Sequence, residues 1–386
     1  MQLSNSVGIP RAVDILKRAI DARRMSHALL LLGPEGNGKL ALAASLAAYL
    51  NCKQKVNGDA CGVCSNCSKS FKLIHPDIHF ILPVASNPDI PEDQSPSAIH
   101  MPVFRKAFLE NPYIELEDWT KQLQSENKQL NIAVRETRAL KRQMYLHAFE
   151  AEYKVAIIWH AEKMNIQSAN ALLKLLEEPP ERTILILTAT DTSTLLPTIT
   201  SRCQSVLVNR IAPEDIQKFL VQKYQVEEDR ALQIALLSDG SIRKAITLIE
   251  PDTQLVSEKF PHWLRLCYEG NIEDLIKLSE AFARENREFQ KFFFETALQR
   301  VRDTIKARYF NENQLLFPAA DKAFLKKLNT SLTEYKLEQI AGFLNNTLQY
   351  TVRNANTQIQ FVALSLRIHK VFKEKQKHNL LYKVNS

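Results

Sequence analysis

The chain has 386 residues, 45% of them hydrophobic, so it is long enough for two or three domains with buried cores. It contains no run of about 18 or more apolar residues, and its first residues lack the charged and apolar segments of a secretion signal. These features argue against a membrane protein and predict a cytoplasmic one. The formal net charge of +7 permits contact with nucleic acid or an acidic partner without requiring it.

The first half of the chain alternates between apolar runs and helical patterns. Amphipathic spacing predicts a helix over residues 10–24, and an Ala/Leu-rich segment predicts another over residues 40–50. Four short, continuously apolar segments have the character of buried parallel strands: Ala28–Leu32, Ile78–Leu82, Val155–Trp159 and Thr183–Ala189. Because helical patterns separate these segments, the sequence predicts an α/β fold with a parallel sheet.

Further helices are predicted over residues 135–148 and 165–178. Asn165 or Ser168 can cap the start of the second helix, and Pro179 and Pro180 end it. Its apolar stripe is expected to comprise Ile166, Ala169, Leu172, Leu173 and Leu176.

The chain divides into three regions in this interpretation. Residues 1–209 form an α/β domain, interrupted over about 84–130 by a proline-containing insertion of loop and short helices. Beyond residue 209 no strand is expected. Residues 210–254 predict a small helical unit, with helices over 213–224, 230–238 and 241–249, and residues 255–386 predict an all-helical region.

The segment Gly33-Pro-Glu-Gly-Asn-Gly-Lys39-Leu40 directly follows the first predicted strand and resembles a phosphate-binding loop. Gly33, Gly36, Gly38 and Lys39 are its candidate nucleotide ligands, because backbone amides at a helix start favour an anion. Such a loop needs Ser or Thr after its lysine to hold Mg²⁺, and Leu40 has no oxygen. The sequence therefore predicts a degenerate nucleotide site and leaves open whether ATP or ADP still binds. The alternative is an ordinary glycine-rich turn from strand to helix.

A hydrolytic site also needs carboxylates at the end of a second strand, to position Mg²⁺ and polarise the attacking water. Trp159 and His160 occupy those positions here. The sequence therefore predicts no ATP hydrolysis by this chain. The alternative is that Glu162, two residues further on, acts as a displaced catalytic carboxylate.

Cys52, Cys61, Cys64 and Cys67 place four thiols within a short segment. Tetrahedral zinc accepts four thiolates, and the two-residue spacing allows one tight knuckle to supply several of them. With four protein ligands the predicted Zn²⁺ site is structural, since no position is open for a substrate. An iron–sulfur cluster and a site without metal are the alternatives. The remaining two cysteines are distant in sequence and are expected to be buried thiols.

These features occur in an order that resembles a known family. The phosphate loop and cysteine cluster are followed by His75-Pro76-Asp77, Ala169-Asn-Ala-Leu-Leu-Lys-Leu-Leu-Glu-Glu-Pro-Pro180, Thr200-Ser-Arg-Cys203 and Gly240-Ser-Ile-Arg243. This order is similar to that of the bacterial DNA polymerase III clamp loader. The resemblance covers about residues 1–250 by motif and the helical C-terminal third by architecture. Within the family, the residues at Leu40 and Trp159-His160 resemble the delta-prime subunits more than the gamma/tau ATPases.

The resemblance implies an AAA+ module over residues 1–209 with a zinc knuckle at 52–67, then a helical lid and a C-terminal collar that oligomerises. It implies that Arg202 acts as an arginine finger on ATP bound by a neighbouring gamma/tau subunit. It also implies that Arg243 belongs, with the loop, to the vestigial nucleotide site. Residues 84–130 have no counterpart in the family pattern, and the sequence assigns them no role.

The implied function is that of a non-hydrolysing member of a five-subunit ring, with gamma/tau and delta as partners. That ring, a component of the DNA polymerase III holoenzyme, opens the sliding clamp and places it on primed DNA. Two alternatives remain: an active ATPase of gamma/tau type, and a zinc-ribbon protein that binds nucleic acid and retains a vestigial loop.

Overall fold

The computed structural model describes residues 1–86, 91, 94–125, 128–249, 252–285, 287–309, 326–352 and 356–374. The chain forms two compact units. The first comprises Met1–Gln225 and Ser238–Ile246, and the second comprises Val226–Leu237 and Thr247–Ser386. No helix in the described part of the chain is long and apolar enough to cross a membrane.

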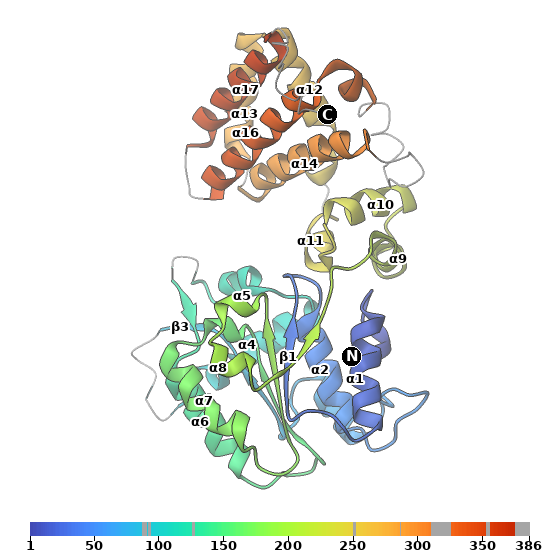
Figure 1. The fold of residues 1–386 in the computed structure, drawn as a ribbon, viewed down its shortest axis with the longest axis vertical. Coiled ribbons are helices and arrows are strands. Elements are labelled where there is room, and N and C mark those ends of the chain that lie inside the picture. The colour runs from blue at the N-terminus through green and yellow to red at the C-terminus, as the bar shows by residue number, and fades with distance from the viewer. Residues whose placement is uncertain are drawn as a thin grey trace, which may run out of the picture. The chain divides into compact units, whose positions relative to one another are not determined.

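The first unit is built on a parallel sheet whose strand order is β2-β5-β6-β1-β7 (Figure 1). The strands are β1 (Ala28–Leu32), β2 (Ile78–Ile81), β5 (Lys154–Ile158), β6 (Thr183–Ala189) and β7 (Gln204–Leu207). Every residue of β1, β5 and β6 is buried, which explains their continuous apolar runs. The parallel α/β fold and four of its strands are thus confirmed.

Strand β7 departs from the sequence prediction, which placed no strand there. Of its four residues only Val206 is buried, because β7 lies at the edge of the sheet and pairs with β1 alone. An edge strand with one buried residue has too few apolar positions to stand out as a run.

Helices flank this sheet (Figure 1). The helices of the unit up to residue 225 are α1 (Pro10–Asp21), α2 (Lys39–Leu50), α3 (Ser65–Phe71), α4 (Pro96–Glu110), α5 (Leu116–Gln122), α6 (Val134–Tyr145), α7 (Ile166–Glu177), α8 (Pro197–Thr200) and α9 (Pro213–Tyr224). Three short 3-10 helices are η1 (Leu3–Asn5), η2 (Ala161–Lys163) and η3 (Thr192–Thr194). All residues of α2 are buried, so the helix that begins at the phosphate loop belongs to the core of the unit.

The start of α7 confirms the predicted cap, because the Asn165 side chain accepts a hydrogen bond of 2.8 Å from the Ser168 amide. The predicted stripe is partly wrong. Ile166 is 67% exposed, whereas Leu175 is buried with Leu172. Ile166 lies about 120° around the helix from Leu172, and so it faces away from the sheet.

The insertion contains more regular structure than the sequence predicts. Two strands, β3 (Val84–Ala85) and β4 (Leu130–Asn131), pair antiparallel at its two ends. Helix α4 spans 15 residues and is not short, although Pro102 lies inside it. Ser95 caps its start by accepting from the Ala98 amide. The cost of an internal proline is offset by packing, since Phe104 and Phe108 of α4 are buried. Residues 87–90, 92–93 and 126–127 of the insertion lie outside the described part.

The described part of the second unit is helical, as predicted for the C-terminal region. Its helices are α10 (Glu228–Leu237), α12 (Asp252–Glu269), α13 (Ile272–Arg284), α14 (Arg287–Lys306), α16 (Glu334–Val352) and α17 (Thr357–Lys373). Trp263 is fully buried among aromatic rings and donates to Ser365 Oγ at 2.8 Å. Helix α11 (Ile242–Thr247) belongs to the first unit up to Ile246. Residues 375–386 lie outside the described part.

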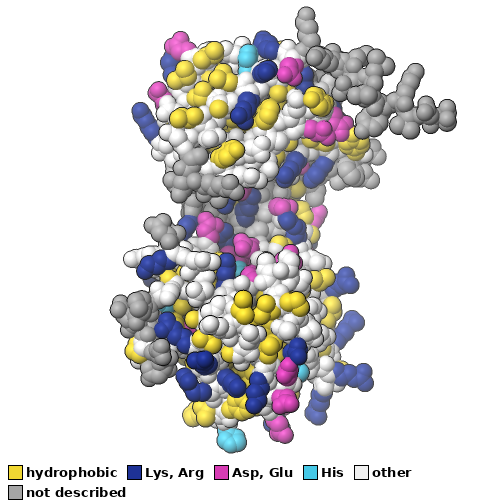
Figure 2. All heavy atoms as spheres, turned by 60° about the vertical axis from the view of Figure 1, so that its left-hand side comes forward, with side chains coloured by type: hydrophobic (Ala, Val, Ile, Leu, Met, Phe, Trp, Pro, Cys, Tyr) yellow, Lys and Arg dark blue, Asp and Glu magenta, His cyan; other side chains and the backbone are white. Residues whose placement is uncertain are grey.

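The face drawn in Figure 2 carries Lys and Arg side chains spread among hydrophobic and other polar ones. Several of them lie close together on the lower part of this view, with hydrophobic and other polar side chains between them.

Candidate functional site

The phosphate loop lies at the carboxyl end of β1 and leads directly into α2. Gly36 has φ +76° and Gly38 has φ +86°, a left-handed conformation that L side chains rarely adopt. A Cβ at Gly36 would lie 1.9 Å from the Ser241 hydroxyl, and one at Gly33 would lie 2.0 Å from the Val208 carbonyl. The shape of the loop therefore requires these glycines, whatever the loop binds.

Lys39 is buried and its side chain turns back onto the loop. Its ammonium donates to the carbonyls of Gly33 and Pro34 and to Asn37 Oδ1. Burial lowers the pKa of Lys39 below its usual range. Leu40 is only 3% exposed, so the residue that replaces the expected hydroxyl is a core side chain.

Helix α11 brings Arg243 to the same loop. The Arg243 amide donates to the Gly36 carbonyl at 3.3 Å. Its guanidinium donates two hydrogen bonds to Asp118, from Nε to Oδ2 at 2.6 Å and from Nη2 to Oδ1 at 2.7 Å. Nη2 also donates to Glu117 Oε2 at 2.9 Å. The structure thus brings together the five predicted nucleotide-site residues: Gly33, Gly36, Gly38, Lys39 and Arg243.

His160 lies at the end of β5 between two carboxylates. Its Nε2 is 3.0 Å from Glu115 Oε2, and its Nδ1 is 3.0 Å from Glu162 Oε1. Burial opposes protonation, but hydrogen bonds and charges from both carboxylates raise the pKa of His160 to about 9. The ring is therefore an imidazolium at neutral pH. Thr190 also donates to Glu162, whose pKa the imidazolium lowers against the opposing effect of burial.

Glu115 is a residue of this site that the sequence did not indicate. It lies in the insertion, 45 positions before His160 in the chain, and is only 5% exposed. Its Oε1 accepts from the Gly36 amide at 2.7 Å. The acidic run Glu115-Leu-Glu-Asp118 was the available signal, but nothing in the sequence joined it to the loop.

The pH dependence of stability should report the charge on His160. Because its folded pKa of about 9 exceeds the unfolded value of about 6.5, its contribution is complete below pH 6.5 and is lost as pH rises through 9. The contribution is on the order of 3 kcal/mol. Denaturant unfolding of wild type and of His160→Gln at pH 6.5, 8 and 9.5 measures it. The difference between the two proteins should shrink across this range, and a constant difference would contradict the charged assignment.

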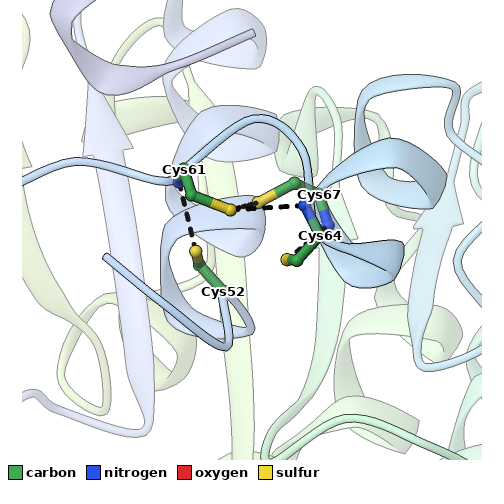
Figure 3. A group of neighbouring side chains, drawn as sticks. All are labelled: Cys52, Cys61, Cys64 and Cys67. Carbon is green, nitrogen blue, oxygen red and sulfur yellow. Dashed lines mark hydrogen bonds between the residues drawn. The ribbon is translucent and has the colours of Figure 1, made fainter. Parts of the chain in front are cut away.

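The four cysteines of the predicted cluster meet at one point, with their sulfurs all within 4.8 Å of one another. Figure 3 shows Cys64 and Cys67 at the start of α3, opposite Cys52 and Cys61. Amides of the cluster donate to its sulfurs: Cys61 to Cys52 at 3.2 Å, Cys64 to Cys61 at 3.3 Å and Cys67 to Cys64 at 3.4 Å. Such N–H···S bonds favour thiolates and hence a bound cation.

The cluster fits a single tetrahedral ion. Four sulfurs about 2.3 Å from zinc lie about 3.8 Å apart, and the Cys61 and Cys67 sulfurs are 3.9 Å apart. In an iron–sulfur cluster the cysteines bind different irons, either singly or in pairs. Their sulfurs therefore lie further apart than around a single ion. The thiolate set would hold Zn²⁺ with no open position. Burial raises the pKa of Cys203 to about 11 and of Cys267 to about 12, which disfavours their thiolate forms. Cys267 is buried, as predicted, whereas Cys203 is half-buried.

Arg202 does not join the loop residues. It follows α8, and its guanidinium contacts Glu177 at the end of α7 together with Thr198 and Ser201. The Arg202 side chain is 35% exposed and that of Glu177 is 47% exposed. An exposed pair of this kind contributes at most about 1 kcal/mol to stability. Its guanidinium therefore remains accessible to exchange Glu177 for another anion.

A comparison with protein families decides the relationship. Residues 8–212, more than half of the chain, match the family model described as "DNA polymerase III, delta subunit". The chain belongs to this family. The match includes the phosphate loop, the cysteine cluster and Arg202, and it confirms the resemblance to clamp-loader subunits.

Individual relatives carry names of two clamp-loader subunit types. DNA polymerase III subunit delta' of Bacillus subtilis (strain 168) is 28% identical over 214 residues, 55% of this chain and 51% of that protein. The delta' subunit of Yersinia pestis is 31% identical over 180 residues, 47% of this chain and 41% of that protein. Subunit tau of Escherichia coli (strain K12) is 28% identical over 249 residues, 63% of this chain and 32% of that protein. The matches thus span about half or less of these relatives.

Among solved structures, a gamma subunit-related protein of Thermotoga maritima aligns with a TM-score of 0.37 and 17% identity. The alignment covers 92% of this chain and 99% of that one.

Proposed function

We propose that this chain is a non-hydrolysing clamp-loader subunit of delta-prime type, with an AAA+ module, a lid over residues 210–254 and a collar over 255–386. It assembles with gamma/tau and delta subunits in the cytoplasm and helps to load the sliding clamp on primed DNA. Arg202 serves in trans as an arginine finger for a neighbouring ATPase subunit, and the four cysteines hold a structural Zn²⁺.

The proposal rests on the side chains at the three positions where hydrolysis would need oxygen atoms. Leu40 and Trp159 are buried apolar side chains, and His160 is fixed between Glu115 and Glu162. None of the three offers an oxygen to Mg²⁺ or to an attacking water. In Glu162, the alternative carboxylate, Oε1 is engaged by His160 and Thr190, and Oε2 is buried without a hydrogen-bond partner among the described residues.

The purified chain should therefore show no meaningful ATPase activity with Mg²⁺. Phosphoryl transfer without a placed metal and an oriented water loses its main electrostatic support. Steady-state phosphate release should stay far below about 1 s⁻¹, the lower end of typical kinase turnover. Turnover at that rate would instead identify an active ATPase of gamma/tau type. That second function is favoured by the 28% identity with the tau subunit of Escherichia coli.

Assembly is tested separately, by mixing the chain with gamma/tau and delta subunits and measuring the mass of the product. One stable complex that contains all three is expected. A chain that stays monomeric in the mixture and binds DNA by itself would support the zinc-ribbon alternative.

A further inference from the structure

The segment Tyr113–Gln122 of the insertion lies directly on the phosphate loop. The carboxylate of Glu115 accepts from the Gly36 amide at 2.7 Å through Oε1 and contacts His160 at 3.0 Å through Oε2. The Glu115 carboxylate thus takes the position that a bound anion would have at the Gly36 amide. Glu115 is buried there. Loops of this type attract anions because their amides point at the ligand.

The same segment also engages the arginine beside the loop. Asp118 accepts both nitrogens of an Arg243 fork, and Glu117 accepts a third bond. Paired, planar contacts of this kind are among the strongest polar interactions of arginine. Arg243 therefore donates to carboxylates of the insertion with the same paired nitrogens that could otherwise bind a phosphate.

Aromatic contacts hold the segment in place. A Cβ at Gly38 would lie 3.0 Å from the Tyr113 ring, so this ring closes over the loop. Trp119 is fully buried and donates to the Pro83 carbonyl at 2.8 Å. Its ring packs edge-on against Phe104 of α4, with the ring centroids 5.5 Å apart. The centroid of the Phe104 ring in turn lies 5.5 Å from that of the Trp159 ring.

The insertion is thus docked on Trp159 and His160, the two residues that stand where a hydrolytic site needs carboxylates. One packs on Phe104 and the other pairs with Glu115. Groups of opposite charge face one another here. Arg243 contacts Glu117 and Asp118, and His160 contacts Glu115 and Glu162. The nearby Lys39 ammonium feels the charges of Glu115 and Glu162. The insertion therefore contacts both of the residues that replace catalytic carboxylates, Trp159 and His160.

We propose that this phosphate loop remains an anion-binding site whose resident ligand is the Glu115 carboxylate of the same chain, and that the segment Tyr113–Gln122 thereby excludes nucleotide. The inference extends the proposed non-hydrolysing role, and it concerns only this chain's own loop. Its test uses the isolated chain without partner subunits. Failure of assembly or of the arginine finger is therefore distinguishable from failure of this inference.

The test removes the internal ligand and supplies an external one. Thermal unfolding and calorimetric titration are measured for wild type, Glu115→Ala and Glu110→Ala, each with and without sodium pyrophosphate, and again with ATP. Glu110 is an exposed acid at the end of α4 in the same insertion and serves as the matched control. Its variant receives the same salt, so general effects of a polyanion on stability cancel.

Wild type and Glu110→Ala should bind neither ligand. Glu115→Ala should unfold about 6–20 °C lower, because His160 and the loop lose a buried partner. Saturating pyrophosphate should raise its midpoint again by about 5 °C or more. Binding by wild type as tight as by Glu115→Ala would overturn the proposal, and so would a folded Glu115→Ala with no affinity for pyrophosphate. If Glu115→Ala does not fold, Glu115→Gln, which keeps the shape and removes the charge, is judged by the same criteria.

Discussion

Replacing any one of Cys52, Cys61, Cys64 and Cys67 by serine should reduce bound zinc from about one ion per chain to well below one. A serine hydroxyl is not a thiolate, and a site with three sulfurs loses both charge and geometry. Metal analysis of protein purified without chelator measures the change. The free energy of unfolding should fall by on the order of 4 kcal/mol, since loss of a metal is among the few single changes with so large an effect.

The structural reason for this cost is that the knuckle anchors the N-terminus. Asp59, between Cys52 and Cys61, accepts from the amides of Leu3 and Ser4 at 3.1 and 2.7 Å. Loosening the knuckle should therefore expose the buried Leu3 as well. Cys203→Ser is the matched control, because Cys203 lies outside the cluster. It should keep the full zinc content, and an equal loss of zinc in this variant would show that the cluster is not the binding site.

The sequence predicted those parts of the fold that local patterns determine. Strands β1, β5 and β6 are buried on both faces, so their apolar runs were unambiguous. The edge strand β7 buries only Val206, and the β3–β4 pair has two residues in each strand, so neither has a pattern long enough to detect. The cysteine cluster was predictable because its four cysteines lie within one short segment of chain.

The interior of the candidate nucleotide site was predictable only in part. Gly33 to Lys39 formed a motif, and Arg243 was added by family resemblance alone. The contact of Glu115 with Gly36 joins residues 79 positions apart, and that of Asp118 with Arg243 joins residues 125 apart. Only the tertiary fold creates such pairs, because no periodicity links an acidic run in an insertion to a glycine loop. The sequence showed His160 only as a residue that stands in place of a carboxylate. Its role as a buried cation depends on the nearby Glu162 and on the distant Glu115, and the sequence did not indicate Glu115.

Arg202→Ala should lower the DNA- and clamp-stimulated ATP turnover of the reconstituted loader while leaving its assembly intact. A guanidinium aimed at the γ-phosphate offsets charge that builds in the transition state, and an arginine finger contributes on the order of 10³–10⁵ in rate at its own site. The measured loss in the whole complex should be smaller, because other subunits keep their own fingers. Arg202→Lys should restore little, since an ammonium lacks the paired donors of a guanidinium.

The contact with Glu177 supplies the control that separates a finger from a structural ion pair. Glu177→Ala breaks the same pair, in which Arg202 Nη2 lies 2.6 Å from Glu177 Oε1, but it leaves the guanidinium in place. If Arg202 acts on ATP of a neighbour, Glu177→Ala should retain most of the stimulated turnover that Arg202→Ala loses. Equal losses in the two variants would show that only the ion pair matters. Wild-type turnover and clamp loading with Arg202→Ala would remove Arg202 from the reaction altogether. Both variants should unfold within about 1 kcal/mol of wild type, because the pair is exposed.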